Sequence, residues 1–395
     1  MKNNIPKKRL FLIDNSPPKN GNGGGTIIRE KQKLFFEQNN YEVWQIYPNV
    51  NNSNFINTKD RQLTFSISSC FLKLCRILQK ANIIEDYLSF WIKKTLKNTK
   101  GFFNCNDTLF CLSGGELSSI ILGSKIKKKY NCFFIANFHD PILNTNISGD
   151  KIININSQIP QKSRDIIFKD YILNSDYLIT SSKTYFKALK FKFPNLNVNY
   201  NYFGFSKKIN KAKRDENNDF NILYGGSFSK IQKPEILIKI IVENNFEGVR
   251  LFLIGDHSKY RRLDKYKQKK YSNKIVFVDQ LNYEEFMSFV SKFIDVGFVS
   301  IDGVLSKYCV PSKLYEYINL EIPILGVAEG DTLEIINSNK IGYCSPNNEE
   351  LLKENLNLII RDFKSLKINI AKIKPYWSFE YTYKKTLKIV KKIHG

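Results

Sequence analysis

Apolar and polar positions along the chain form two successive runs in which short buried strands alternate with amphipathic helices. The first run predicts strands at 9–14, 42–47, 108–112, 132–137, 177–180 and 198–203, and helices at 27–39, 116–130 and 181–192. The second run predicts strands at 220–224, 249–254, 275–278, 296–299 and 322–327, and helices at 234–242, 283–290 and 312–320. Such alternation is typical of parallel sheets covered by helices. We therefore expect an α/β protein with two doubly wound domains and a ligand cleft between them.

A polar, charged stretch separates the two runs and marks a linker. The predicted organisation is an N-terminal domain at 1–206, a linker at 207–219, a C-terminal domain at 220–374 and a terminal helix at 375–395 that returns to the N-terminal domain. A chain of 395 residues, 42% of them hydrophobic, is long enough to bury two cores.

The segment 65–100 departs from the strand–helix alternation, because its apolar clusters and lysines recur at helical spacing. We expect these residues to form helices packed in a domain core. The alternative is a basic amphipathic surface that contacts a membrane, and both can hold for different faces.

The net charge of the chain bears on its possible partners and not on its fold. Lysine and arginine number 61 against 37 acidic residues, which gives a net charge of +24 and an attraction to polyanions. The lysines are spread among asparagine and isoleucine, and no RNA- or DNA-binding motif is present, so we expect no nucleic-acid partner. The seven cysteines, an odd number, favour reduced thiols. We expect a cytoplasmic protein, with peripheral contact at an anionic inner membrane face as the alternative.

Glycines follow the first predicted strand. Gly23, Gly24, Gly25 and Thr26 precede the helix at 27–39, and glycine permits a positive φ and a close approach of a ligand to the backbone. We expect a ligand-facing loop, with a merely flexible loop as the alternative. The spacing is not GxGxxG, which argues against a dehydrogenase.

Two further stretches carry candidate chemistry. The strand at 132–137 ends in Phe138-His139-Asp140-Pro141, which places His139 where ligands gather in parallel sheets. Farther on, Pro311 and Ser312 are signals for a helix start, and the N–H groups of a helix start attract phosphate. Glu316 lies one turn later, where it can accept hydrogen bonds from sugar hydroxyls. The alternative is a capped surface helix with a solvated Glu316.

Together these segments resemble a family. The sequences GNGGGTIIREK, YGGSFSKIQKPEILI and PSKLYEYINLEIPIL are similar to motifs of GT-B glycosyltransferases, and most of all to the retaining family numbered four, which builds bacterial surface polysaccharides. The resemblance implies a GT-B fold of two Rossmann-like domains. The N-terminal domain with its glycine-rich loop would bind the acceptor, and the C-terminal domain would bind a nucleotide-sugar donor.

The resemblance also implies roles for residues. Gly226 would face the donor phosphates, with Lys230 as the countercharge and Lys233 as the competing candidate. Ser227 stands where many relatives have arginine. The other implied donor contacts are Ser312 and Lys313 to the diphosphate and Glu316 to the ribose.

His139 would lie near the anomeric carbon of the transferred sugar. Many relatives carry a pair of glutamates in the segment of Glu316, but this chain has Tyr308 at the place of the first one, so the resemblance leaves the recognition of the donor sugar open.

The expected function is a glycosyltransferase that moves a sugar from a nucleotide-activated donor to a saccharide or lipid-linked saccharide acceptor in surface polysaccharide synthesis. Retention of configuration is implied by the resemblance alone. Lysines and helix N–H groups can stabilise the leaving nucleoside diphosphate, and no D-x-D carboxylate cluster is present, so we expect neither a metal nor another cofactor. The alternatives are a GT-B epimerase or phosphorylase, or a non-catalytic polyanion-binding relative.

Overall fold

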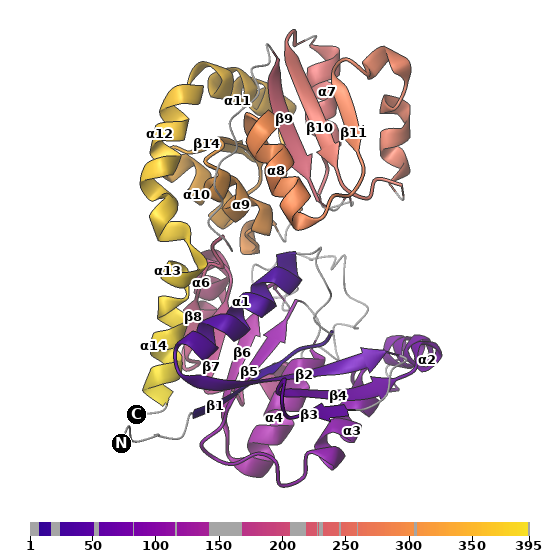
Figure 1. The fold of residues 1–395 in the computed structure, drawn as a ribbon, viewed down its shortest axis with the longest axis vertical. Coiled ribbons are helices and arrows are strands. Elements are labelled where there is room, and N and C mark those ends of the chain that lie inside the picture. Colours follow the sequence, from indigo (N-terminus) through magenta and orange to yellow (C-terminus); the bar gives the residue numbers. More distant parts are fainter. Residues whose placement is uncertain are drawn as a thin grey trace. The chain divides into compact units, whose positions relative to one another are not determined.

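A computed structural model of the chain divides into two units (Figure 1). The first unit comprises Met1–Lys19, Arg29–Asn201 and Lys384–Gly395, and the second comprises Asn20–Ile28 and Tyr202–Tyr383. The structure describes residues 8–16, 24–50, 55–81, 83–114, 117–141, 168–205, 219–226, 228, 232–244, 246–258, 260–303 and 306–393. The expected linker therefore lies almost entirely outside the described residues.

The first unit is built on an 8-stranded sheet with the order β3-β4-β2-β1-β5-β6-β7-β8. Its strands are β1 (Lys8–Ile13), β2 (Tyr41–Val50), β3 (Phe55–Asn57), β4 (Gln62–Ile67), β5 (Thr108–Ser113), β6 (Phe133–Phe138), β7 (Tyr177–Thr180) and β8 (Val198–Tyr200). All neighbouring pairs are parallel except β3 with β4. The strand order reverses between β1 and β5, so the carboxyl ends of these two strands flank a crevice of the kind that binds ligands.

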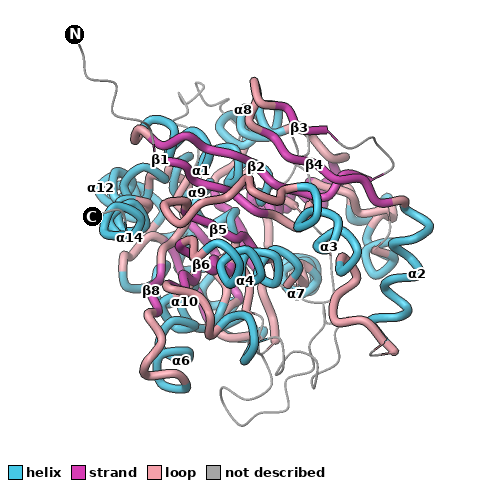
Figure 2. Tube along the Cα trace, turned by 90° about the horizontal axis from the view of Figure 1, so that it is seen from below, coloured by secondary structure: helices cyan, strands magenta, loops and turns pink. Residues whose placement is uncertain are grey.

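Helices cover both faces of this sheet. They are α1 (Gly24–Gln38), α2 (Ser69–Lys80), α3 (Ser89–Asn98), α4 (Ser118–Tyr130), the short π-helical turn η1 (Phe168–Ile172), α6 (Lys183–Lys192) and α14 (Lys384–Ile393). The helix α1 lies on one face, and α3 and α4 pack together on the other (Figure 1). Figures 1 and 2 both show α2 at the periphery of the unit, beyond the end of β4.

The second unit contains a 6-stranded parallel sheet with the order β11-β10-β9-β12-β13-β14. Its strands are β9 (Phe220–Gly225), β10 (Val249–Ile254), β11 (Ile275–Val278), β12 (Val296–Ser300), β13 (Ile324–Val327) and β14 (Gly342–Ser345). Here the order reverses between β9 and β12, and doubly wound sheets commonly bind ligands at the carboxyl ends of the strands at such a reversal.

The α-helices of the second unit are α7 (Glu235–Glu243), α8 (Tyr283–Phe293), α9 (Ser312–Leu320), α10 (Gly330–Ser338), α11 (Glu349–Arg361), α12 (Phe363–Ile373) and α13 (Phe379–Thr382). Short 3-10 turns are η2 (Arg261–Tyr266), η3 (Lys269–Tyr271), η4 (Ser306–Tyr308) and η5 (Lys374–Trp377). The helices α7 and α11 pack together, and α8 packs with α9. The core between sheet and helices is formed by buried side chains such as Ile222, Leu237, Phe298 and Leu352.

Two expected elements differ from the structure. The helical pattern expected from residue 65 begins inside β4, because Leu63, Phe65 and Ile67 are buried as members of that strand. The helix α2 starts only after Ser68, whose side chain accepts a hydrogen bond from the Phe71 N–H.

The terminal helix expected at 375–395 is divided into η5, α13 and α14. Pro375 stands in the 3-10 turn, and Ser378 caps a new helix by accepting a hydrogen bond from the Tyr381 N–H. The last helix, α14, belongs to the first unit, where Lys385 Nζ lies 4.6 Å from the centre of the Tyr200 ring.

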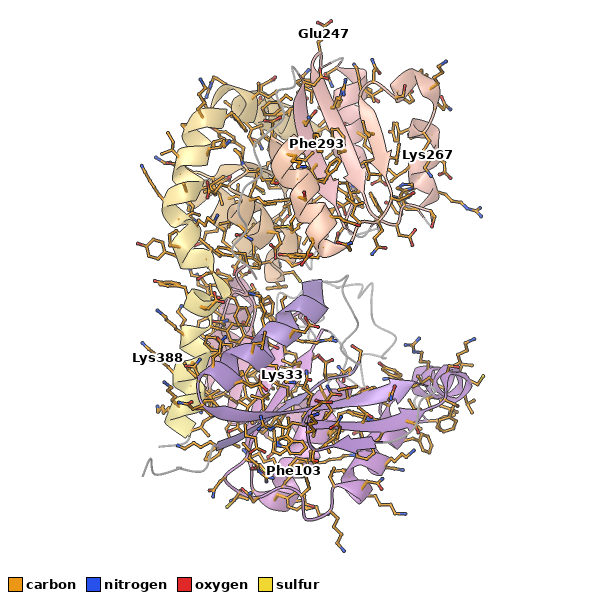
Figure 3. All side chains as sticks on the ribbon, in the orientation of Figure 1. Lys33, Phe103, Glu247, Lys267, Phe293 and Lys388 are labelled. Carbon is orange, nitrogen blue, oxygen red and sulfur yellow. The ribbon has the colours of Figure 1, made fainter. Side chains whose placement is uncertain are left out.

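Surface lysines account for much of the charge. Lys267 and Lys388, for example, are exposed on the outside of their units (Figure 3). All seven cysteines are free thiols.

Candidate functional site

The candidate donor site lies in the second unit, at the carboxyl edge of its sheet. Gly226 directly follows β9, the strand at which the order reverses, and has a positive φ of 116° that favours glycine. The neighbouring strand, β12, ends at Ser300, and the connection after it leads to the start of α9 at Ser312. The end of β9 and the start of α9 thus lie close together, as the contact between Gly226 and Lys313 shows.

The helix α9 runs from Ser312 to Leu320, the range predicted from the sequence. Pro311 occupies the N-cap position. Ser312 is therefore the first helical residue and not the cap of the helix. Pro311 makes no side-chain hydrogen bond to this helix start. Its first N–H groups thus keep their capacity to bind an anion.

Lys313 points its ammonium group toward Gly226. A Cβ atom built on Gly226 would lie 3.8 Å from Lys313 Nζ, at van der Waals contact, so the glycine turn and the ammonium group are direct neighbours. Lys313 Nζ also donates a hydrogen bond to Gln232 Oε1 at 3.2 Å and lies 4.0 Å from the centre of the Tyr224 ring. The ring face attracts the cation. Burial nevertheless lowers the pKa of Lys313 to about 7.

Gln232 holds this arrangement together. Its Oε1 atom accepts a second hydrogen bond, from the hydroxyl of the buried Tyr224, at 3.0 Å. The amide oxygen thus orients both the lysine and the tyrosine. Gln232 is not among the site residues predicted from the sequence.

Glu316 lies one turn into α9 and is half-buried. Its Oε2 atom accepts a hydrogen bond from the hydroxyl of Tyr283 at 2.9 Å. Tyr283 is the first residue of α8, where Asn282 and Glu285 form a capping box that fixes the helix start. Tyr308, which replaces the first glutamate of the family pair, is buried with 4% of its surface exposed.

Close packing sets the position of α9. A Cβ atom on Gly297, in the middle of β12, would lie 2.3 Å from a ring carbon of Tyr317 in α9. Only glycine leaves room for this ring against the strand. The buried Tyr317 therefore fixes how near α9 approaches the sheet.

Lys233 lies in different surroundings. Its ammonium group forms an ion pair with Asp302, which also accepts a hydrogen bond from the Asn347 side chain at 3.0 Å. Lys233 lines a pocket of about 300 Å³ whose lining includes none of Gly226, Lys313 and Glu316. Its competitor Lys230, and Ser227, lie outside the described residues.

The first unit holds a second polar cluster, around His139. The backbone of His139 is held by the neighbouring strands: its N–H donates to Ser113 O at 2.8 Å, and its carbonyl accepts from Ser181 Oγ at 2.5 Å. Burial, with a smaller contribution from the charge of Arg29, lowers the pKa of His139 to about 3. The imidazole is therefore neutral at physiological pH and is suited to hydrogen bonding rather than to acid catalysis.

Polar side chains after β1 complete this cluster. Arg29 forms an ion pair with Asp14 and donates a hydrogen bond to Ser16 Oγ at 2.9 Å. Asn15 Oδ1 accepts a hydrogen bond from the Ser119 N–H at 2.7 Å. The arrangement sits at the carboxyl edge of the sheet, as predicted for His139 from its position after a strand.

The glycine-rich loop differs from expectation. Gly24, Gly25 and Thr26 form the first turn of α1 rather than a loop, because the helix begins three residues earlier than the hydrophobic pattern indicated. Gly23 lies outside the described residues.

Within the part of the chain that the structure describes, no group of three or more histidine, cysteine, aspartate or glutamate side chains is placed to hold a metal ion. None of the helices there has the length and apolar character needed to span a bilayer.

Two doubly wound units, each built on a largely parallel sheet, are the architecture of the GT-B fold. Residues 205–373 match the family model "Glycosyl transferases group 1". Among curated proteins, no sequence matches the chain.

Solved structures with similar folds include glycosyltransferases over the whole length of the chain. The alpha,alpha-trehalose 6-phosphate synthase from Burkholderia multivorans has a TM-score of 0.70 at 7% identity, covering 98% of this chain and 97% of that chain. HepE from Anabaena, in complex with UDP-glucose, has a TM-score of 0.64 at 10% identity over 97% and 99% of the two chains. The lipopolysaccharide outer core galactosyltransferase WaaB has a TM-score of 0.59 at 12% identity over 96% and 99%.

The matched domain and the shared fold identify the protein as a glycosyltransferase with the GT-B fold. The fold and enzyme class expected from the sequence are thereby confirmed. Membership of the retaining family numbered four stays a prediction, as do the roles of the individual site residues.

Proposed function

We propose that the enzyme transfers a sugar from a nucleotide-activated donor to a saccharide or lipid-linked saccharide acceptor in the synthesis of a surface polysaccharide such as capsule, O-antigen or lipooligosaccharide. The observation that carries the proposal is the cluster of Gly226, Lys313 and Glu316 at the carboxyl edge of the second sheet. It brings a glycine turn next to a lysine at a helix start, with a carboxylate one turn further along the same helix.

Each member of the cluster has a proposed role. The diphosphate would bind the start of α9 at Ser312, next to Gly226, with Lys313 as its countercharge. Glu316, oriented by Tyr283, would accept hydrogen bonds from the ribose hydroxyls. Lys230 and Ser227, with Lys233 as the alternative to Lys230, are proposed as further phosphate contacts.

The proposed chemistry follows from the charge that develops on the leaving group. As the bond to the sugar breaks, negative charge grows on the nucleoside diphosphate, and a preformed cation and helix N–H groups stabilise it. We propose that this replaces a metal ion. With no covalent nucleophile assigned, attack from the same face would retain the configuration, and the neutral His139 would orient the transferred sugar.

The proposed setting is the cytoplasm, at the inner face of the plasma membrane. Uridine donors are the first to test, because HepE was solved with UDP-glucose and a related Escherichia coli structure with UDP-2-fluoro glucose.

A thermal-shift screen with UDP-, GDP-, ADP-, dTDP- and CMP-sugars tests the donor proposal. One class of donor should raise the unfolding temperature, because a ligand that binds only the folded state stabilises it. Glu316→Gln should reduce this shift, whereas Glu354→Gln, at an exposed position on α11, should leave it unchanged. His139→Ala should slow transfer and keep the shift.

The proposal is wrong in its donor site if Glu316→Gln and Glu354→Gln show the same shift as the parent. It is wrong altogether if no nucleotide sugar stabilises the protein.

A further inference from the structure

The helix α2 in the first unit exposes an apolar stripe that the donor site does not explain. Leu74 is 48% exposed and Ile77 is 63% exposed, and both lie on the side of the helix that faces away from the buried Cys75 and Gln79. Cys70 and Ala81 extend the same stripe at helical spacing, and both are exposed. A soluble surface helix normally turns such a stripe inward.

The stripe continues onto the neighbouring segments. Ile83, directly after α2, is 68% exposed, and Phe90, at the start of α3, is 42% exposed. The ring of Phe90 contacts Phe71 of α2, with the ring centres 4.8 Å apart, so the two helices share this surface. Exposed apolar residues that occur singly need no explanation, but a cluster of this kind marks an interaction site.

Basic residues border the apolar stripe. Lys73 and Arg76 are exposed along one side of α2, and Lys93 lies on α3 with its Nζ atom 5.7 Å from the centre of the Phe90 ring. We call this surface the α2 face; its members are Cys70, Lys73, Leu74, Arg76, Ile77, Ala81, Ile83, Phe90 and Lys93.

Carboxylates do not offset this charge. From Ser69 to Asn98 the sequence contains two acidic residues, Glu85 and Asp86. Glu85 accepts a hydrogen bond from the Tyr171 hydroxyl at 2.5 Å and pairs with Lys125 at 3.7 Å. Asp86 is fully buried. The α2 face therefore presents apolar and positive groups together.

We propose that the α2 face docks on an anionic membrane surface, with Leu74, Ile77 and Phe90 inserted among the lipids and the basic residues against the headgroups. An apolar stripe bordered by lysine and arginine has the chemistry of an interfacial helix. The anionic headgroups supply the complementary charge. A protein partner would not require this combination of outward apolar groups with a lysine and arginine border.

The position of α2 would place the acceptor side of the enzyme at the membrane. The strand β4 runs parallel to β2 and β1, so α2 begins at the carboxyl edge of the sheet, the edge at which His139 lies. Docking through α2 would bring that edge to the lipid surface, where a lipid-linked acceptor resides. This proposal names the surface that would contact the membrane and rests on the proposed function at the inner membrane face. Docking itself does not use the donor site.

Co-sedimentation with vesicles tests the proposal. The full-length protein should bind vesicles that contain phosphatidylglycerol and bind pure phosphatidylcholine vesicles at least about tenfold more weakly. Leu74→Gln with Ile77→Gln, and separately Lys73→Gln with Arg76→Gln, should each weaken binding at least about tenfold. All four side chains are exposed, so the variants should fold normally.

Matched controls come from α6, which lies at the other end of the sheet. Phe191 is 88% exposed and Lys187 is also exposed, so Phe191→Gln and Lys187→Gln remove the same kinds of group elsewhere and should keep full vesicle binding. The thermal shift with the donor should persist in every variant, which separates a failure of this proposal from a failure of the donor site.

A fluorescent label gives an independent readout. Cys70 lies in the stripe, whereas the exposed Cys105 lies before β5, at the opposite, amino edge of the sheet. An environment-sensitive dye on Cys70, in a Cys105→Ser background, should shift to the blue on phosphatidylglycerol vesicles. The same dye on Cys105, in Cys70→Ser, should not shift.

The proposal is overturned if vesicles do not bind the protein, or if the α2 variants bind as well as the α6 controls. It is also overturned if the parent is a dimer that the α2 variants convert to monomers, because a second copy would then cover the α2 face.

Discussion

At the scale of single residues, Lys313 offers the sharpest test of the donor site. Its pKa of about 7 lies well below the usual lysine value of 10.5 because burial disfavours the charged form of the ammonium group. A bound diphosphate would favour the charged form and raise that pKa. Above pH 7, binding must therefore take up a proton, and affinity should fall as the pH rises.

We predict that the affinity for a nucleoside diphosphate is highest below about pH 7 and declines toward about pH 9, by at most tenfold per pH unit. Lys313→Met should remove this pH dependence and weaken binding at neutral pH by about 2 kcal/mol. Isothermal titration calorimetry in buffers of different ionisation enthalpy measures both affinity and proton uptake.

Lys233→Met is the matched control, because the Lys233 ammonium is already paired with Asp302. It should retain the pH dependence. If the dependence instead disappears in Lys233→Met and persists in Lys313→Met, the phosphate role belongs to Lys233.

Sequence reasoning reached some members of the site and missed others for a physical reason. The resemblance pointed to Lys313 and Glu316, which lie in one motif. Gln232 and Tyr283 contact them from 81 and 33 residues away, and only the fold brings such distant positions together. The choice between Lys230 and Lys233 likewise depends on partners such as Asp302, 69 residues from Lys233.

At the scale of elements, the approach of α9 to β12 depends on Gly297. We predict that Gly297→Ala lowers the free energy of unfolding by about 2 kcal/mol, because the new methyl group overlaps the Tyr317 ring. It should also weaken donor binding, since Lys313 and Glu316 move with the displaced helix. Chemical denaturation and the thermal-shift assay measure the two effects.

A second substitution distinguishes displacement of the helix from other causes. Gly297→Ala with Tyr317→Leu removes the ring that the methyl group meets and should recover donor binding relative to Gly297→Ala alone. If donor binding is equally poor in both variants, the Gly297–Tyr317 contact does not position α9.

Some elements were predictable from local pattern and others were not. The start and end of α9 agree with the prediction because Pro311 favours a helix start and the apolar face continues to Leu320. The boundary between β4 and α2 was missed because buried residues at alternate positions in the strand merge with the apolar positions of the helix. The break near Ser378 was missed because the apolar pattern runs on through it.

At the scale of the whole molecule, each unit has its own sheet and its own core, so ligands of one unit should stabilise that unit first. Trp44 and Trp91 lie in the first unit and Trp377 in the second. In a Trp377→Phe variant, tryptophan fluorescence therefore reports on the first unit alone.

We predict that a nucleoside diphosphate at about 100 times its dissociation constant stabilises the second unit by about 2.7 kcal/mol. The denaturation midpoint followed by circular dichroism should rise, while the fluorescence midpoint of Trp377→Phe should rise less. Equal shifts in the two signals would show that the units unfold as one cooperative body.

The doubly wound architecture was the most predictable property of the chain, because it follows from the repeated order of strands and helices and needs no knowledge of side-chain contacts. The order of strands within each sheet, including the edge strand β3, required the structure.

The amide of Gln232 has one further consequence, which concerns how the charge of the site is balanced. Because an amide oxygen carries no formal charge, Gln232 orients Lys313 without neutralising it. A glutamate at this position would make an equally good hydrogen bond, yet it would form a closed ion pair and repel a diphosphate. With glutamine in place of glutamate, the charge of the protonated Lys313 stays available for a bound diphosphate to balance.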